Sequence, residues 1–213
     1  MLWGGIIAYA VGVLALTLVE VREARGWQVM LKPLLAVGFV GTILLTGGAT
    51  SGLYGHLVLL ALLACAVGDV LLLRKGTGAA FLAGMGAFGL GHLIFAFAFA
   101  IVWEGSTSAI PGLLAVALIV LPAMIAWRLA RRSQTEIMAV AAALYGIAIG
   151  GMLALAAASG TWLILPALAF AVSDLFVAQN RFGAPRSWHP VAITPLYFGA
   201  QLAFALSPLL LSA

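Results

Sequence analysis

Eight segments of continuously apolar sequence occupy most of this chain, and each approaches the length of a membrane-spanning helix. Such a helix needs about 20 predominantly apolar residues to cross the hydrocarbon core of a bilayer. The strands of a membrane β-barrel would instead alternate apolar and polar residues. We therefore predict an all-α, polytopic membrane protein with eight transmembrane helices. The segments are residues 2–19, 31–46, 55–73, 79–102, 109–127, 134–157, 160–178 and 190–211.

The composition agrees with this fold class. The chain is 65% hydrophobic and 8% charged, whereas soluble domains are about 25% charged. We predict a single integral membrane domain over residues 1–213. Its first apolar run is expected to be a retained helix rather than a cleaved signal peptide, because no basic residue precedes it. Cys65 is the only cysteine, which excludes an intrachain disulfide and a cysteine metal cluster.

The basic residues fall into four groups, separated by loops and termini that contain no Lys or Arg. Because Lys and Arg concentrate in cytoplasmic loops, all four groups are predicted on the cytoplasmic side and both termini outside. The same pattern accounts for the net charge of +4, so we expect no nucleic-acid partner. The groups are Arg22, Arg25 and Lys32; Arg74 and Lys75; Arg128, Arg131 and Arg132; and Arg181 and Arg186.

Two aspartates stand out because apolar sequence flanks each of them on both sides. They end similar four-residue stretches, Ala66–Asp69 and Ala171–Asp174, which lie 105 positions apart. A carboxylate at membrane depth is costly to desolvate, so it usually faces a bundle interior, a partner or a substrate path. Counted back from the basic loops, Asp69 lies about 7 Å deep and Asp174 about 10 Å deep. We predict one site built from both.

Other polar residues at comparable depth are candidates for substrate binding. Each has a structural alternative: a tyrosine hydroxyl can bond a backbone carbonyl, a histidine can be satisfied in the core, and a basic residue can anchor the loop. Tyr197 is expected near the level of the aspartates, and three others nearer the midplane. The candidates are Lys32, His92, Tyr145, Arg181, Tyr197 and Gln201.

The segment at residues 79–102 combines an aromatic face with small residues. Side chains spaced three and four apart share one side of a helix, and glycines permit close helix contact. The same reasoning applies to two glycines in the sixth segment. The predicted face is Phe81, Gly84, Phe88, His92 and Phe95, and the packing glycines are Gly84, Gly86, Gly89, Gly91, Gly146 and Gly150.

The half-chains 1–105 and 106–213 show signs of an internal repeat. The two aspartates lie in the third and seventh segments, and an offset of four helices keeps both halves in the same orientation. Many folds with such repeats place their site between the halves. Four residues of the fourth segment also align at constant offset with four of the eighth: Phe88, His92, Leu93 and Phe95 with Tyr197, Gln201, Leu202 and Phe204.

A zinc centre is not expected from this sequence. A zinc hydrolase normally uses three protein ligands, but His56, His92 and His189 are predicted near the outer face, the midplane and the cytoplasmic edge. A magnesium ion held by the two aspartates stays open. The sequence also lacks a nucleophile elbow and a Gly-rich phosphate loop.

Taken in order along the chain, these residues resemble the lysoplasmalogenase family of eight-helix membrane proteins, called YhhN-like in bacteria. The resemblance covers essentially the full length, with Phe95 at a position where a tyrosine is expected. The matching residues are Lys32-Pro33, at the expected start of the second helix, Gly68-Asp69, Phe81, Gly84, Phe88, His92, Tyr145, Ser173-Asp174, Arg181-Phe182, Tyr197 and Gln201.

The resemblance implies a hydrolase of the vinyl ether bond of lysoplasmalogens, without an organic cofactor, in the bacterial inner membrane. The partners would be a lysophospholipid substrate and membrane lipids. A general acid must keep its proton near neutral pH, and burial of a carboxyl group or a second carboxylate nearby favours that form. We therefore expect an aspartate dyad; Asp69 as acid and Asp174 as base is the preferred assignment, and the reverse assignment stays open. Lys32 and Arg181 would bind phosphate, and the other candidates would position glycerol hydroxyls or water.

Two further functions fit the residues alone. A small-molecule or lipid transporter would also need a central two-aspartate site and glycine-rich helices. A noncatalytic membrane subunit is disfavoured, because it leaves two buried aspartates without a role. The physiological lipid and the oligomeric state are not fixed by the sequence.

Overall fold

The apolar segments form helices over nearly their full predicted lengths. The computed structural model describes residues 2–74, 76, 78–102 and 112–211. Within these residues the secondary structure is helical, and the first residues of the predicted segment 109–127 lie outside them. The elements are α1 (Leu2–Val21), α2 (Arg25–Leu45), the short 3-10 helix η1 (Gly48–Thr50), α3 (Gly52–Leu72), α4 (Ala79–Ile101), α5 (Gly112–Ser133), α6 (Glu136–Ala158), α7 (Ile164–Phe182) and α8 (His189–Leu211).

The start of α2 differs from the prediction. The sequence placed Pro33 in the first turn, where its missing N–H costs nothing, but α2 begins at Arg25 and Pro33 lies inside it. The helix therefore continues through a proline and gives up one internal hydrogen bond. The added turns carry Trp27 and Met30, which are 62% and 66% exposed. They extend the outward apolar surface of α2 toward the membrane interface.

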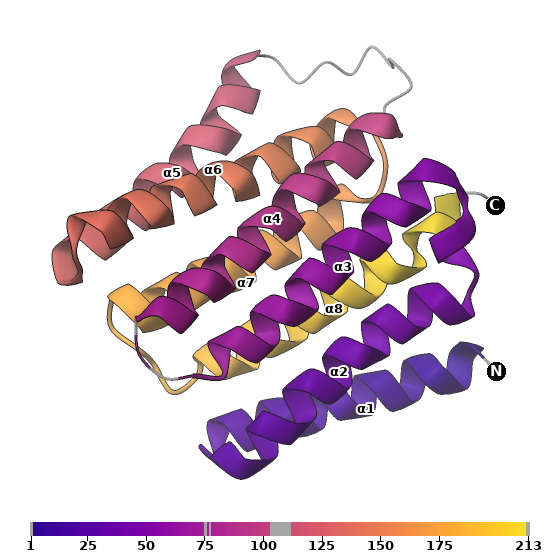
Figure 1. Ribbon diagram of the computed structural model, residues 1–213, viewed down its shortest axis with the longest axis horizontal. Helices are drawn as coiled ribbons and strands as arrows, with labels where there is room; N and C mark the ends of the chain where they lie inside the picture. Colours follow the sequence, from indigo (N-terminus) through magenta and orange to yellow (C-terminus); the bar gives the residue numbers. More distant parts are fainter. Residues whose placement is uncertain (1, 75, 77, 103–111, 212–213) are drawn as a thin grey trace.

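Consecutive helices run in opposite directions, so alternate loops lie at opposite ends of the bundle (Figure 1). Helix α8 lies inside the bundle and contacts α1, α2, α3 and α7, and α4 packs between α3 and α6. Helix α5 is outermost and packs mainly on α6. The loops α1–α2, α3–α4, α5–α6 and α7–α8 share one end, and both termini lie at the other (Figure 1). Lys75 lies outside the described residues.

The bundle has apolar side chains on its outer surface and polar ones inside. Leu45, Trp3 and Phe97 are 90%, 76% and 70% exposed, whereas Asp69 and His92 are buried. Seven of the helices in the described residues are long and apolar enough to cross a membrane. Helix α7 is the eighth, and the polar residues of its last turn lower its mean hydropathy. The protein is an integral, multi-pass membrane protein.

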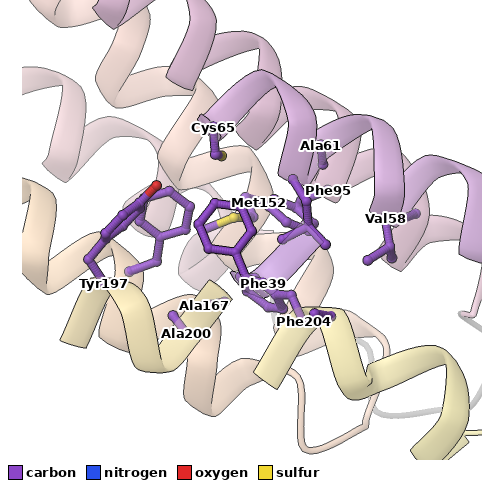
Figure 2. Packing of buried hydrophobic residues seen from close by; sticks show 14 of the residues in the cluster. Phe39, Val58, Ala61, Cys65, Phe95, Met152, Ala167, Tyr197, Ala200 and Phe204 are labelled. Carbon is purple, nitrogen blue, oxygen red and sulfur yellow. The ribbon is translucent and has the colours of Figure 1, made fainter. Parts of the chain in front are cut away.

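Among the described residues, aromatic and small side chains from α1 to α4 and from α6 to α8 build the core, and Figure 2 shows part of it. Phe95 and Phe204 lie with ring centroids 4.4 Å apart and, like Phe39, are fully buried.

Thr135 accepts a hydrogen bond from the Met138 N–H and so caps the start of α6. Caps of this kind stabilise a helix by about 1 kcal/mol.

The predicted role in close helix packing is confirmed for four of the six glycines. A Cβ on Gly84 or Gly91 would lie 2.6–2.7 Å from side chains of α3. A Cβ on Gly146 or Gly150 would lie 2.4–2.5 Å from the backbone of α5. Gly89 has only an ordinary contact with Tyr145. The prediction is wrong for Gly86, which faces open space on the outer side of α4 because it lies off the buried stripe.

Candidate active site

A cavity of about 290 Å³ lies inside the bundle and is bounded by residues of α2 to α8. Most of the lining side chains are apolar, including Phe81 and Phe88 of the predicted aromatic face. Phe95, from the same face, packs in the core. Seven polar residues also line the cavity: Lys32, Asp69, Tyr145, Ser173, Asp174, Thr194 and Tyr197. The two aspartates therefore share one cavity.

Asp69 is held by a single phenol. Its Oδ2 atom accepts a hydrogen bond from the Tyr197 hydroxyl at 2.6 Å. The Tyr197 ring is fixed edge-on by Phe88 and Phe170, with ring centroids 5.7 and 5.2 Å away. Asp69 is 7% exposed. Only this bond reaches the Asp69 carboxyl among the described residues, so Oδ1 has no protein donor there.

Asp174 is held by two donors on one oxygen. Its Oδ2 atom accepts from the Tyr145 hydroxyl at 2.9 Å and lies 2.9 Å from His92 Nε2. The other ring nitrogen, Nδ1, faces the Met152 sulfur at 3.4 Å. A proton on Nε2 of His92 satisfies this arrangement. His92 is fully buried and does not line the cavity, but it contacts two residues that do, Asp174 and Tyr145, whose hydroxyl lies 3.2 Å from His92 Nε2.

The two sets of contacts cross between the halves of the chain. Asp69 on α3 bonds Tyr197 on α8, and Asp174 on α7 bonds His92 on α4. The two carboxyl groups differ in their surroundings, because Asp174 has two hydrogen-bond partners on one oxygen and Asp69 has one. The arrangement can therefore place a proton donor and a proton acceptor on the wall of one cavity.

A cluster at the end of the cavity nearest the α1–α2 loop joins α1, α2 and α8. Lys32 Nζ lies 2.8 Å from Glu20 Oε1, and the Thr194 hydroxyl donates to Glu20 Oε2. Lys32 was predicted from the sequence as a binding residue, whereas Glu20 was not. Glu20 lies at the end of the first apolar segment, so apolar sequence flanks it on one side only. The sequence offered two weak signs that Glu20 takes part in the site: its side chain is long, and the basic Lys32 follows twelve residues later.

Arg181 and Gln201 do not line the cavity. The Arg181 guanidinium donates to the backbone carbonyls of Leu72 and Gly76, both at 3.3 Å, and lies 5.1 Å from the centroid of the Phe81 ring. It thus binds the end of α3 at the edge of the site. Gln201 is fully buried, and neither amide atom has a hydrogen-bond partner in the described part of the chain.

The three histidines lie at separate places in the bundle. His56 is at the start of α3, where Nδ1 lies 2.6 Å from the Gly52 carbonyl oxygen. His189 begins α8 and bonds Asn180, while His92 is in the core beside Asp174. Across the described residues, three or more His, Cys, Asp or Glu side chains do not gather in a group that could hold a metal ion.

Comparison with known proteins places this chain in a family. The sequence profile of the YhhN family matches residues 27–208. The chain belongs to the YhhN family. Lysoplasmalogenase TMEM86B of Homo sapiens is 32% identical over 179 residues, which cover 84% of this chain and 73% of the human protein. Lysoplasmalogenase TMEM86B of Sus scrofa is 32% identical over 183 residues, covering 85% and 74%. No solved structure matches.

The YhhN match includes the candidate residues from Lys32 to Gln201 and both aspartates. Glu20 lies before the matched residues. The family assignment therefore carries no information on the role of Glu20, which has to be argued from its contacts.

Proposed function

We propose that this YhhN protein is a lysoplasmalogenase. It would hydrolyse the vinyl ether bond of a lysoplasmalogen to a long-chain aldehyde and glycerophosphoethanolamine or glycerophosphocholine. The observation that carries this proposal is the pair Asp69 and Asp174 on the wall of one largely apolar cavity, which Lys32 also lines. The activity named for the mammalian relatives supports it.

The cavity suits a single-chain lipid. Its apolar wall, to which Phe81 and Phe88 contribute, would hold the alkenyl chain. Lys32 would bind the phosphate, since charge-assisted hydrogen bonds to phosphate are strong. Arg181, bound beside Phe81 at the edge of the site, would add positive potential near the headgroup. The vinyl ether would then lie between the headgroup and the chain, at the level of the aspartates.

In the proposed mechanism Asp69 gives its proton to the alkene carbon that is not bonded to the ether oxygen. The alkene electron pair forms the new C–H bond, and an oxocarbenium ion remains. Asp174, as a carboxylate, stabilises this cation and takes a proton from the water that attacks it. The resulting hemiacetal loses the glycerol oxygen, which takes the hydroxyl proton, and the aldehyde is released. Transfer of the proton from Asp174 back to Asp69 restores the pair.

His92 and Tyr145 would orient Asp174, and Tyr197 would orient Asp69. A magnesium ion between the carboxylates is an alternative for which the described residues supply only two carboxylate ligands. Gln201, buried beside the Cys65 thiol, would act behind the site rather than on the lipid.

We also infer a parallel repeat and a cytoplasmic position for the basic loops. An offset of 105 residues relates Asp69 on α3 to Asp174 on α7, and an offset of 109 relates His92 on α4 to Gln201 on α8. The bonds of the two aspartates cross between the halves, from Asp69 to Tyr197 on α8 and from Asp174 to His92 on α4. Such a crossed arrangement is what two equivalent halves around one site would produce.

Aldehyde release from a lysoplasmalogen by the purified protein in detergent tests the function. Asp69→Asn and Asp174→Asn should each lower kcat by roughly 100-fold or more, the scale of general acid–base catalysis. Glu136→Gln, at an exposed acid that begins α6, is the matched control and should keep full activity. Full activity in either aspartate variant would refute the dyad. Coupled uptake into proteoliposomes without aldehyde release would favour a transporter.

A further inference from the structure

The ion pair between Glu20 and Lys32 has a feature that phosphate binding alone does not explain. Glu20 and Lys32 are mostly buried, with side chains 12% and 31% exposed. Lys32 lines the cavity, as does Thr194, the second partner of Glu20. Glu20 itself lies directly behind these two residues. A negative charge is thus held next to the lysine that would meet the lipid phosphate.

Apart from the exposed Glu23, the charged residues in the loops around this negative charge are basic. Arg22 follows on the α1–α2 loop and Arg25 begins α2, and Arg74 and Arg186 belong to the neighbouring loops at this end of the bundle. For a ligand that is only anionic, Glu20 weakens binding, because it competes with the phosphate for Lys32 and repels it. A charge that is mostly buried is also costly unless it is paired. A ligand that separated Lys32 from Glu20 without pairing Glu20 would therefore bind poorly.

A zwitterionic headgroup removes this penalty. Its phosphate can replace the Glu20 carboxylate at Lys32, and its ammonium group can replace Lys32 at Glu20. All four charges then stay paired, and one ion pair becomes two. Thr194 keeps its bond to Glu20 Oε2, so the carboxylate stays in place when Lys32 turns toward the phosphate.

We propose that Glu20 and Lys32 form the headgroup site for a zwitterionic lysophospholipid, with Lys32 on the phosphate and Glu20 on the ammonium group. This inference rests on the proposed function and adds a selection rule to it. Lipids with an ethanolamine or choline headgroup are accepted, and lipids that carry phosphate without an amine are disfavoured. Glu20 is the residue that discriminates.

The experiment compares lipids that differ in headgroup and carry the same alkenyl chain. Alkenyl lysophospholipids with ethanolamine, choline and glycerol headgroups are assayed for aldehyde release with the wild-type protein and with Glu20→Gln. The amide of Glu20→Gln keeps the shape and an acceptor for Thr194. Its preference for the zwitterionic lipids should fall roughly tenfold, the scale of one lost charge-assisted contact. Glu20→Asp keeps the charge and should keep the direction of the preference.

Glu23→Gln is the control, since Glu23 is an exposed acid in the same turn, three residues further on. It should leave the preference unchanged. An equal loss for all three headgroups in Glu20→Gln, or no change, would overturn the inference, because a purely structural role gives that result.

A second arm measures binding without turnover. Saturated alkyl lysophospholipids with the same three headgroups are titrated into each variant, and the rise in thermal unfolding temperature reports binding. Wild type should prefer the zwitterionic lipids, and Glu20→Gln should lose that preference. If no vinyl ether is cleaved but this pattern holds, the proposed function fails and the headgroup site stands. If aldehyde is released but binding ignores the headgroup, the site fails alone.

Discussion

At the residue scale, the two aspartates differ in how they are held, and single-atom changes can separate their roles. Tyr197→Phe removes one hydroxyl, the only described donor to Asp69, and leaves the ring packing in place. We expect kcat to fall roughly tenfold or more, because a hydrogen bond to a charged or ionising group contributes about 1.5–3 kcal/mol. Steady-state aldehyde release measures kcat and KM, and KM should change less than kcat.

Tyr54→Phe supplies the comparison on the same pair of helices. The Tyr54 hydroxyl lies 2.7 Å from the Ser207 hydroxyl, also buried between α3 and α8, but at the opposite end of these helices from Lys32. Its loss should lower the thermal unfolding temperature while kcat is preserved. Equal loss of kcat in Tyr197→Phe and Tyr54→Phe would mean that the Tyr197 hydroxyl acts through stability alone.

The residues that could be identified from the sequence are those whose desolvation cost is evident without knowledge of the fold. Asp69 and Asp174 are expensive in any apolar helix, so their shared cavity could be anticipated. Glu20 could not, because a charge at the end of an apolar segment is ordinary until a partner from another helix encloses it. Arg181 gave the same signal as any loop arginine, and only the structure assigns its hydrogen bonds to the end of α3.

At the element scale, apolar length predicts the helices well, whereas their exact starts and contacts need the packed bundle. Helix α2 begins before Pro33 because outward apolar residues continue upstream, and proline alone is a weak boundary signal. The stripe that faces inward is also invisible in a helix that is apolar all round. Glycine content therefore predicted Gly84 correctly and Gly86 wrongly.

The two kinds of glycine make a matched pair of substitutions. Gly146→Ala places a Cβ 2.5 Å from the Ala123 backbone on α5, so the helices must separate. We expect a loss of about 1–3 kcal/mol in stability, with reduced aldehyde release, because Gly146 and the neighbouring Pro122 both line the cavity. Thermal unfolding in detergent and the activity assay measure both effects.

Gly86→Ala adds the same methyl group where nothing lies within 4 Å. It should raise stability by up to about 1 kcal/mol through helix propensity alone and leave activity unchanged. Destabilisation of the same size in Gly86→Ala and Gly146→Ala would show that close α5–α6 contact is not what Gly146 provides.

At the scale of the whole molecule, charge and fold give one expected orientation in the membrane. The loops that carry the basic residues share one end of the bundle, and the termini share the other (Figure 1). Because Lys and Arg are retained on the cytoplasmic side during insertion, the Lys32 end of the cavity should open toward the cytoplasmic leaflet. The lipid headgroup would then enter from that leaflet.

The single buried cysteine makes this orientation measurable. Two variants are made in a Cys65→Ala background: Arg186→Cys in the α7–α8 loop and Thr50→Cys in η1. Each carries one exposed thiol, and the two thiols lie at opposite ends of the bundle. A membrane-impermeant maleimide added to intact spheroplasts should label Thr50→Cys, while Arg186→Cys should react only after the membrane is opened. The reverse pattern would place Lys32, Glu20 and the headgroup site on the outer leaflet. Aldehyde would then be released on the outer side, so the labelling result decides which leaflet supplies the substrate.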